Sequence, residues 1–271
     1  MVLREFSLDG KVVIVTGAGR GLGRVIALTM AEAGADIVCA GRTPASLEAI
    51  AREVQELGRT AQVVLTDVTR ADQVEAMVKT ALDTFGQIDV LVNNAGLLIA
   101  KPIVPLPDLN SGRLSRFGSV NEAITEEEWR SVVDTNLLGP FLCCQAVGPH
   151  MLERRSGKVV NVISVAAGKG YPSIVSYGAT KAALANFTRS LALEWAPYNI
   201  NINAIGPANF PTRMNAPIHQ EGRALEQTLS RIPLGRLGDL RHVGLLAVYL
   251  ACEASSYMTG QSMYLDGGVL A

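Results

Sequence analysis

Short hydrophobic runs alternate with amphipathic stretches along the chain. The first run, 12–15, consists of β-branched residues, as expected for a strand that is buried on both faces of a sheet. The stretch behind it predicts a helix with Leu22, Ile26 and Met30 on its apolar stripe. Gly34 ends this helix. The remaining runs predict strands at 37–40, 63–65, 88–92, 158–163, 200–205 and 263–265.

Capping residues mark where several helices begin. Thr43 and Pro44 predict the start of one helix, with the threonine as its cap and the proline as its first residue. Thr125 and Glu128 have the spacing of a capping box, and the helix that they open runs through Asn136. Because strands and helices alternate, we expect an α/β fold, a Rossmann-type doubly wound parallel sheet of about seven strands with helices on both faces. Further helices are predicted at 74–85, 177–194 and 242–252.

Two long segments interrupt the alternation. Residues 97–124 and 207–235 contain several prolines and show no helical or strand period. Long loops beyond the carboxyl ends of parallel strands commonly surround a ligand. We therefore interpret 207–235 as a lid over a substrate and 97–124 as an insertion loop, for which a tolerated surface insertion is an equal alternative. No linker divides the chain, so we expect residues 1–271 to form a single domain.

Composition narrows the class of protein and its partners. Hydrophobic residues make up 48% of the chain and charged residues 18%, which is enough apolar material for a large core. A net charge of −1 offers no basic excess for nucleic acid. No apolar stretch approaches the ~18 residues of a membrane span, and the N-terminus lacks the pattern of a signal peptide. We therefore expect a cytoplasmic protein with neither a nucleic-acid nor a membrane partner.

The cysteines and histidines suggest no metal site. Neither set has the spacing of metal ligands, and the histidines lack the context of a catalytic triad. We expect reduced cysteines within the core and histidines on the surface. These residues are Cys39, Cys143, Cys144, Cys252, His150, His219 and His242.

A glycine-rich turn, 17–23, lies where the first predicted strand becomes the first helix. Glycines allow the backbone to turn sharply and to approach a pyrophosphate closely. The helix N-terminus adds free N–H groups and the positive end of a dipole. The strand–turn–helix context makes a dinucleotide site the favoured interpretation.

The spacing of this turn and the motifs after it carry a resemblance to a known family. The turn reads T-G-x-x-x-G-x-G from Thr16 to Gly23. The later motifs are Asp67-Val68, Asn93-Asn94-Ala95-Gly96, Asn136, Ser164, Tyr177, Lys181, Thr259-Gly260-Gln261 and Asp266-Gly267-Gly268. In this order they resemble the short-chain dehydrogenase/reductase family, in its compact single-domain branch, over almost the whole chain. One departure is Pro207-Ala208, where the family usually has Pro-Gly.

This resemblance implies a dinucleotide-binding oxidoreductase that moves a hydride between nicotinamide and a ketone or secondary alcohol. The chain is similar to gluconate 5-dehydrogenases and to 3-oxoacyl-carrier-protein reductases. The resemblance also implies a small-molecule substrate, a homotetramer and no metal. The cofactor-binding positions that it implies are Gly17, Arg20, Gly21, Leu22, Gly23, Arg42, Thr43, Asp67, Val68, Asn94, Ala95, Gly96, Tyr177, Lys181, Pro207 and Thr212.

The end of the second predicted strand bears on which nicotinamide cofactor is used. NAD-preferring proteins place an acidic residue there, which binds the adenine ribose hydroxyls. This chain has Gly41 and Arg42 instead, and Arg20 lies within the glycine turn. Two guanidinium groups without the acid favour the 2′-phosphate of NADP(H), although NAD is left open.

Tyr177 and Lys181 are the predicted centre of the chemistry. Residues four apart share one face of a helix, so the ammonium would lie beside the phenol. The cation favours phenolate and would lower the pKa of Tyr177 toward neutrality, which suits a general acid and base. By resemblance, Ser164 orients the substrate oxygen and Lys181 also holds the nicotinamide ribose.

Asn136 completes the implied catalytic set. Pro140 lies four residues later and has no N–H to donate to the Asn136 carbonyl, so we expect a kink in the helix. By resemblance, this carbonyl supports a water that relays protons to Lys181.

Other functions remain as alternatives. They are an NAD(H)-linked sugar-acid or polyol dehydrogenase, a 3-oxoacyl thioester reductase, a sugar-nucleotide epimerase and a non-catalytic nucleotide-binding regulator. The Tyr177–Lys181 pair disfavours the regulator, and the absence of an acid after the second strand disfavours the epimerase. Within 97–124, Lys101, Arg113 and Arg116 are candidate contacts for an anionic substrate.

Overall fold

A seven-stranded parallel sheet forms the centre of the computed structural model, which describes residues 3–106, 121–212 and 222–271. The strand order is β3-β2-β1-β4-β5-β6-β7, so the chain starts in the middle and winds outward in both directions. This is the doubly wound sheet that the alternating pattern predicted. The strands are β1 (Val12–Thr16), β2 (Asp36–Gly41), β3 (Ala61–Leu65), β4 (Val90–Asn93), β5 (Gly157–Val162), β6 (Ile200–Pro207) and β7 (Ser262–Leu265).

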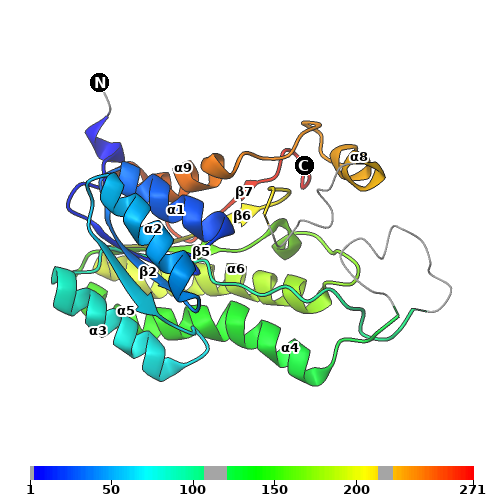
Figure 1. Cartoon of the computed structure of the whole chain (residues 1–271), viewed down its shortest axis with the longest axis horizontal. Helices are drawn as coiled ribbons and strands as arrows, with labels where there is room; N and C mark the ends of the chain where they lie inside the picture. The colour runs from blue at the N-terminus through cyan, green and yellow to red at the C-terminus, as the bar shows by residue number, and fades with distance from the viewer. Residues whose placement is uncertain (1–2, 107–120, 213–221) are drawn as a thin grey trace.

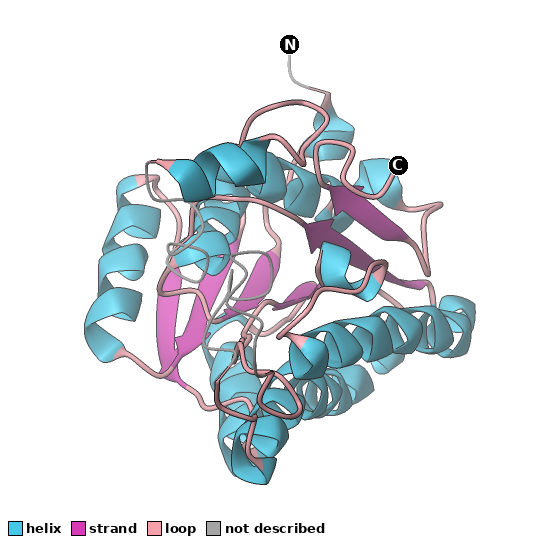
Figure 2. Cartoon of the chain, turned by 90° about the vertical axis from the view of Figure 1, so that its right-hand side faces the viewer, coloured by secondary structure: helices cyan, strands magenta, loops and turns pink. Residues whose placement is uncertain are grey.

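Helices cover both faces of the sheet (Figures 1 and 2). One face carries α1 (Gly21–Glu32), α2 (Pro44–Glu56) and α9 (Leu240–Ala251), and the other carries α3 (Ala71–Phe85), α5 (Gly139–Arg154) and α6 (Val175–Trp195). The packing of strand β1 explains why residues 12–15 are all apolar. Val13 and Val15 pack into the first core, whereas Val12 and Ile14 pack into the second.

The helix that leads to Asn136 is irregular, as its proline predicted. The capping box of Thr125 and Glu128 is present and opens α4 (Glu126–Val133). A π-helical turn, Asp134–Leu138, then joins α4 to α5. Pro140 lies in the first turn of α5 and cannot donate a backbone hydrogen bond to Asn136. The expected kink is therefore a π-turn, and Asn136 lies buried within it.

The two irregular segments differ in what they contain. In the described parts of 97–124, residues 97–106 and 121–124 form neither helix nor strand, as expected. The segment 207–235 contains α8 (Arg223–Leu229), a helix that the sequence pattern did not predict. Isolated helices of this length are unstable in water, so α8 depends on tertiary contacts. A helix of 7 residues is also too short to show a clear hydrophobic period in the sequence. Residues 213–221, the centre of the predicted lid, lie outside the described residues.

The cysteine prediction is confirmed, and one predicted cap is not. Cys39, Cys143, Cys144 and Cys252 are free and buried. Pro44 begins α2 as expected, but the side chain of Thr43 accepts no capping hydrogen bond. The described residues contain no group of side chains suited to a metal ion. None of the helices among them is long and apolar enough to cross a membrane.

Candidate active site

A cavity of about 790 Å³ opens at the carboxyl ends of the central strands. Most of its lining residues come from the turns that follow β1, β2, β3, β4, β5 and β6, because parallel strands all end at the same edge of the sheet. Every residue that was predicted for cofactor binding lines this cavity, and so do Ser164, Tyr177 and Lys181. Asn136 does not line it, although its neighbour Thr135 does.

The glycine turn forms one end of the cavity and has room for little beyond backbone. Gly17 has a φ of 65°, a left-handed conformation that favours glycine. A Cβ added to Gly23 would lie 2.2 Å from the carbonyl oxygen of Gly17. Helix α1 then begins at Gly21 with no acidic residue in its first turn. Its free N–H groups and positive dipole end therefore face the cavity as an anion site.

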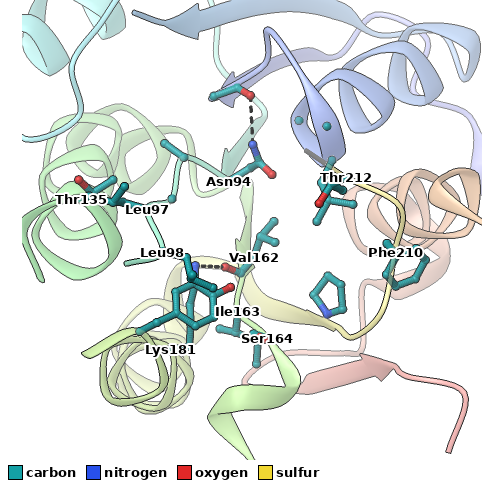
Figure 3. Close-up of a pocket in the computed structure, with 18 of the residues that line it drawn as sticks. Asn94, Leu97, Leu98, Thr135, Val162, Ile163, Ser164, Lys181, Phe210 and Thr212 are labelled. Atoms are coloured by element: carbon teal, nitrogen blue, oxygen red, sulfur yellow. Dashed lines mark hydrogen bonds between the residues drawn. The ribbon is translucent and has the colours of Figure 1, made fainter. Parts of the chain in front are cut away.

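Asn94 holds this turn against the end of β4. Its side-chain amide donates to the carbonyl oxygen of Thr16 at 2.8 Å. It also donates to the carbonyl oxygen of Gly17 at 3.3 Å (Figure 3). The Thr16 hydroxyl in turn accepts from the backbone N–H groups of Asn94 and Ala95, at 3.0 and 3.1 Å. These contacts position the turn. The sequence motif began at Thr16, but its spacing alone did not reveal this hydrogen-bonding role.

The far end of β2 carries the predicted cofactor-selecting residues. The Arg42 guanidinium lies 3.7 Å from the Asp67 carboxylate and is 70% exposed. Burial raises the pKa of Asp67, but hydrogen bonds from Thr69 and the nearby arginines outweigh it and lower that pKa overall. Asp67 therefore remains an anion that offsets part of the positive charge of Arg42.

Sequence reasoning missed Ser46, which lines the cavity beside Gly19.

Lys181 lies deep in the cavity beside Tyr177. It is only 4% exposed, and its ammonium donates to the Val162 carbonyl at 2.7 Å (Figure 3). The nitrogen lies 5.7 Å from the centre of the Tyr177 ring, so the pair shares one helix face as predicted. Burial lowers the pKa of Lys181 to about 8, because a charged form is poorly solvated there.

The pKa of Tyr177 differs from the sequence expectation. Burial raises it, and a hydrogen bond from Ser164 opposes that effect only in part. Lys181 was expected to lower the pKa, but its ammonium is bound to Val162 and burial dominates. The phenol is therefore protonated at neutral pH, with the Ser164 hydroxyl at its side.

Asn136 acts on this region through its side chain. Its amide group donates to the Leu97 carbonyl and to the Thr180 hydroxyl, at 2.9 and 3.1 Å, and its oxygen accepts from the Leu97 N–H at 2.8 Å. Thr180 then donates to the backbone carbonyl of Tyr177 at 2.8 Å. Asn136 thus ties the loop after β4 to the helix that carries Tyr177. The relay water on its carbonyl stays a prediction.

The sequence suggested Lys101 as a contact for an anionic substrate, but Lys101 does not line the cavity. Its ammonium lies 2.7 Å from Glu128 and 3.3 Å from Glu122, and these carboxylates neutralise it. The positive charge of Lys101 is therefore paired within the protein and is not available to a substrate. Arg113 and Arg116 lie outside the described residues.

The histidines differ from one another. His242 is exposed, as expected. His150 is half-buried, and its ring accepts a hydrogen bond from the Ile88 N–H at 3.2 Å, so it is structural rather than a simple surface residue. His219 lies outside the described part of the chain.

Known proteins place the chain in a family that matches this geometry. The family model for short chain dehydrogenases matches residues 11–223, and the chain belongs to the short-chain dehydrogenase/reductase family. Members of this family that resemble it are dehydrogenases and reductases, and the chain is an NAD(P)-dependent oxidoreductase.

Two relatives and one solved structure illustrate the similarity. A 3-oxoacyl-acyl-carrier-protein reductase of Thermotoga maritima is 35% identical over 263 residues, which is 97% of this chain and 99% of the relative. A 2-dehydro-3-deoxy-D-gluconate 5-dehydrogenase of Bacillus subtilis is 37% identical over 268 residues, 98% of this chain and 97% of the relative. A gluconate 5-dehydrogenase from Burkholderia cenocepacia J2315, in complex with NADP and tartrate, has a TM-score of 0.88 at 33% identity, covering 98% and 97% of the two chains.

Proposed function

We propose that this chain is an NADP(H)-dependent oxidoreductase that acts on a ketone or secondary alcohol. The observation that carries the proposal is the meeting of Tyr177, Ser164 and Lys181 in one cavity with the glycine turn. A proton donor for the substrate oxygen thus lies in the same cavity as the glycine turn, which can bind the anionic part of a cofactor. The nicotinamide, when bound, supplies or accepts the hydride.

The residues present fit an NADP(H) molecule. The glycine turn forms a cradle that side chains would fill, and Arg20 and Arg42 are both exposed toward the cavity. No acid stands at Gly41, and the only carboxylate among the described lining residues, Asp67, is paired with Arg42. Phosphate is the group that these donors suit. The NADP complex of the Burkholderia cenocepacia relative supports the same choice, with NAD as the alternative.

Tyr177 is the proposed general acid and base. In reduction it donates its phenolic proton to the substrate oxygen, and its raised pKa keeps that proton in place at neutral pH. Ser164 donates to the same oxygen and orients it. Lys181 holds the ribose of the cofactor and favours phenolate once its charge turns toward Tyr177. Asn136 positions the helix that carries them and supports a proton-relay water.

Replacing Tyr177 with phenylalanine tests this function. The substitution removes one hydroxyl, so the fold and the NADPH affinity should persist while turnover falls by roughly 10²–10⁴-fold. Turnover is measured with NADPH across a panel of sugar acids, polyols, cyclic ketones and acetoacetyl thioesters. Tyr198→Phe is the matched control, because Tyr198 is exposed after α6 and does not line the cavity. Near-normal turnover in Tyr177→Phe would contradict the proposal.

The same panel separates the competing substrates. The similarity to sugar-acid dehydrogenases favours a sugar acid or polyol, and the similarity to 3-oxoacyl-acyl-carrier-protein reductases favours a 3-oxoacyl thioester. A protein that binds NADPH but turns over no member of the panel would instead be a nucleotide-binding regulator. We further expect a cytoplasmic protein that assembles as a homotetramer.

A further inference from the structure

The cavity carries much more positive charge than the chain as a whole. The chain has a net charge of −1, yet the described residues that line the cavity include five basic side chains and one acidic side chain. They are Arg20, Arg42, Lys169, Lys181, Arg231 and Asp67. This concentration indicates that the cavity receives anionic groups.

Only part of this charge is explained by a bound dinucleotide. Arg20 and Arg42 lie at the glycine turn and at the end of β2, and Lys181 lies beside Tyr177. Lys169 and Arg231 lie neither at the dinucleotide end of the cavity nor beside Tyr177 in the chain. Lys169 follows the short turn after Ser164, and Arg231 follows α8.

The C-terminal segment contacts both of the chain segments that carry these two cations. The Lys169 ammonium lies 3.4 Å from the carbonyl oxygen of Val269, which itself lines the cavity. Just after Arg231, the Leu234 N–H donates to the Gly267 carbonyl at 3.1 Å. The segments that carry Lys169 and Arg231 therefore both contact the same C-terminal turn, and both side chains line the cavity.

Neither cation is neutralised by a carboxylate among the residues that the structure describes. Ion pairs there involve Lys101, Arg42 and other basic side chains, but not Lys169 or Arg231. Both are exposed at the cavity. An ammonium and a guanidinium facing a shared space, with no protein anion between them, are suited to a carboxylate, which a guanidinium can bind through two hydrogen bonds.

We propose that Lys169 and Arg231 bind the carboxylate of a small oxo or hydroxy acid whose carbonyl or alcohol reacts at Tyr177. This inference rests on the proposed function and specifies its substrate class. The substrate then has two handles, its oxygen at Ser164 and Tyr177 and its carboxylate at the C-terminal turn. Neutral ketones and polyols lack the second handle.

Matched substrate pairs test this assignment. Four- to six-carbon oxo acids and their methyl esters are compared with NADPH in the wild type, Lys169→Met and Arg231→Met. We expect KM for the acids to rise roughly 10- to 100-fold in each variant, the scale of a lost charge-assisted hydrogen bond. The kcat, the NADPH affinity and KM for the esters should change little. Lys169→Arg keeps the charge and should retain most of the affinity for the acid.

Two comparisons make the outcome decisive. Arg236→Met is the control, because Arg236 is an exposed cation of the same segment that does not line the cavity. The assignment fails if the esters match the acids in the wild type, if acetoacetyl-coenzyme A is preferred over every acid, or if Lys169→Met and Arg231→Met leave KM for the acids unchanged.

A binding measurement separates this failure from failure of the proposed function. Calorimetric titration of the oxo acids into the NADP-bound protein requires no turnover. Binding that depends on both cations, without reduction of any acid, would overturn the proposed function and leave the carboxylate site standing. Turnover of neutral ketones, with no acid binding at Lys169 and Arg231, would do the reverse.

Discussion

Burial changes the proton affinities of Tyr177 and Lys181 in opposite directions. It raises the pKa of the phenol and lowers that of the ammonium to about 8, because the uncharged form of each is easier to bury. Both groups therefore sit closer to their neutral forms than free side chains would. An anionic cofactor adds the negative charge that favours the lysine cation.

The lowered pKa of Lys181 predicts how stability depends on pH. Below pH 8 the lysine is charged in both states, and the folded chain carries the full cost of the buried cation, on the order of 3 kcal/mol at most. Between pH 8 and 10.5 the unfolded chain holds more protons, so the wild type gains stability as the pH rises. Relative to the wild type, Lys181→Met should be most stable below pH 8 and lose that advantage toward pH 10.5.

Thermal unfolding of the cofactor-free proteins, measured from pH 7 to 10.5, checks this expectation. Lys79→Met is the control, because Lys79 is exposed on α3 and its replacement removes a lysine without removing a buried charge. A difference between Lys181→Met and the wild type that stays constant over the range would contradict it. NADPH titration of Lys181→Met should separately show weaker binding, since the ribose loses a donor.

Arg42 should decide the preference for NADPH. It is exposed at the end of β2, where a 2′-phosphate would lie, and Asp67 is its only ion-pair partner among the described residues. Arg42→Ala should weaken NADPH binding by roughly 1–3 kcal/mol and leave NADH binding little changed. Fluorescence titration with the two cofactors measures this. Equal losses for both would show that the arginine does not read the phosphate.

At the scale of elements, the turn between β1 and α1 depends on its glycines. A helical Gly→Ala change ordinarily adds about 1 kcal/mol of stability. At Gly23 the added Cβ would lie 2.2 Å from the Gly17 carbonyl and 2.4 Å from the Asn94 amide nitrogen, so the helix must move away from β4. Gly23→Ala should instead destabilise the protein by about 1–3 kcal/mol and weaken NADPH binding.

Urea unfolding and NADPH titration test this pair of effects. Gly170→Ala is the control for stability, because nothing lies within 4 Å of its added Cβ and its φ is not left-handed. Unchanged stability in Gly23→Ala would mean that α1 is not held as tightly as its contacts with Gly17 and Asn94 indicate.

Elements with strong local signals were predictable, and those without them were not. The capping box at Thr125 and the proline of α5 are local hydrogen-bonding features, and both helices begin or distort where expected. Helix α8 has no such signal and lies between prolines. Whether Thr43 caps α2 through its side chain depends on rotamer and neighbours, which the sequence does not specify.

At the scale of the whole molecule, we expect exposed apolar side chains on α5 and α6 to lie in the subunit interfaces of the predicted homotetramer. Phe141 is 42% exposed and Leu193 is 78% exposed. Apolar surface of this kind is commonly covered by a partner subunit. Replacing either residue with aspartate should shift the assembly to smaller species, because a carboxylate would be buried without a partner.

Light scattering at micromolar concentration measures this assembly. Leu57→Asp is the control, since Leu57 is 43% exposed at the end of α2, away from these helices. A wild-type monomer under the same conditions would contradict the homotetramer.

The sequence by itself determined the alternation of strands and helices, the glycine turn and the identity of the Tyr177–Lys181 pair. These features depend on periodicity and on residues close together in the chain, and local spacing encodes both. It also determined that Lys181 and Tyr177 would share a face.

Only the tertiary structure decided which charges are available and which way the pKa values move. Lys101 is neutralised by Glu122 and Glu128, whereas Lys169 and Arg231 line the cavity without a described carboxylate partner. Burial outweighs the lysine in setting the pKa of Tyr177. Desolvation and ion pairing depend on segments far apart in the sequence, so no local pattern could reveal them.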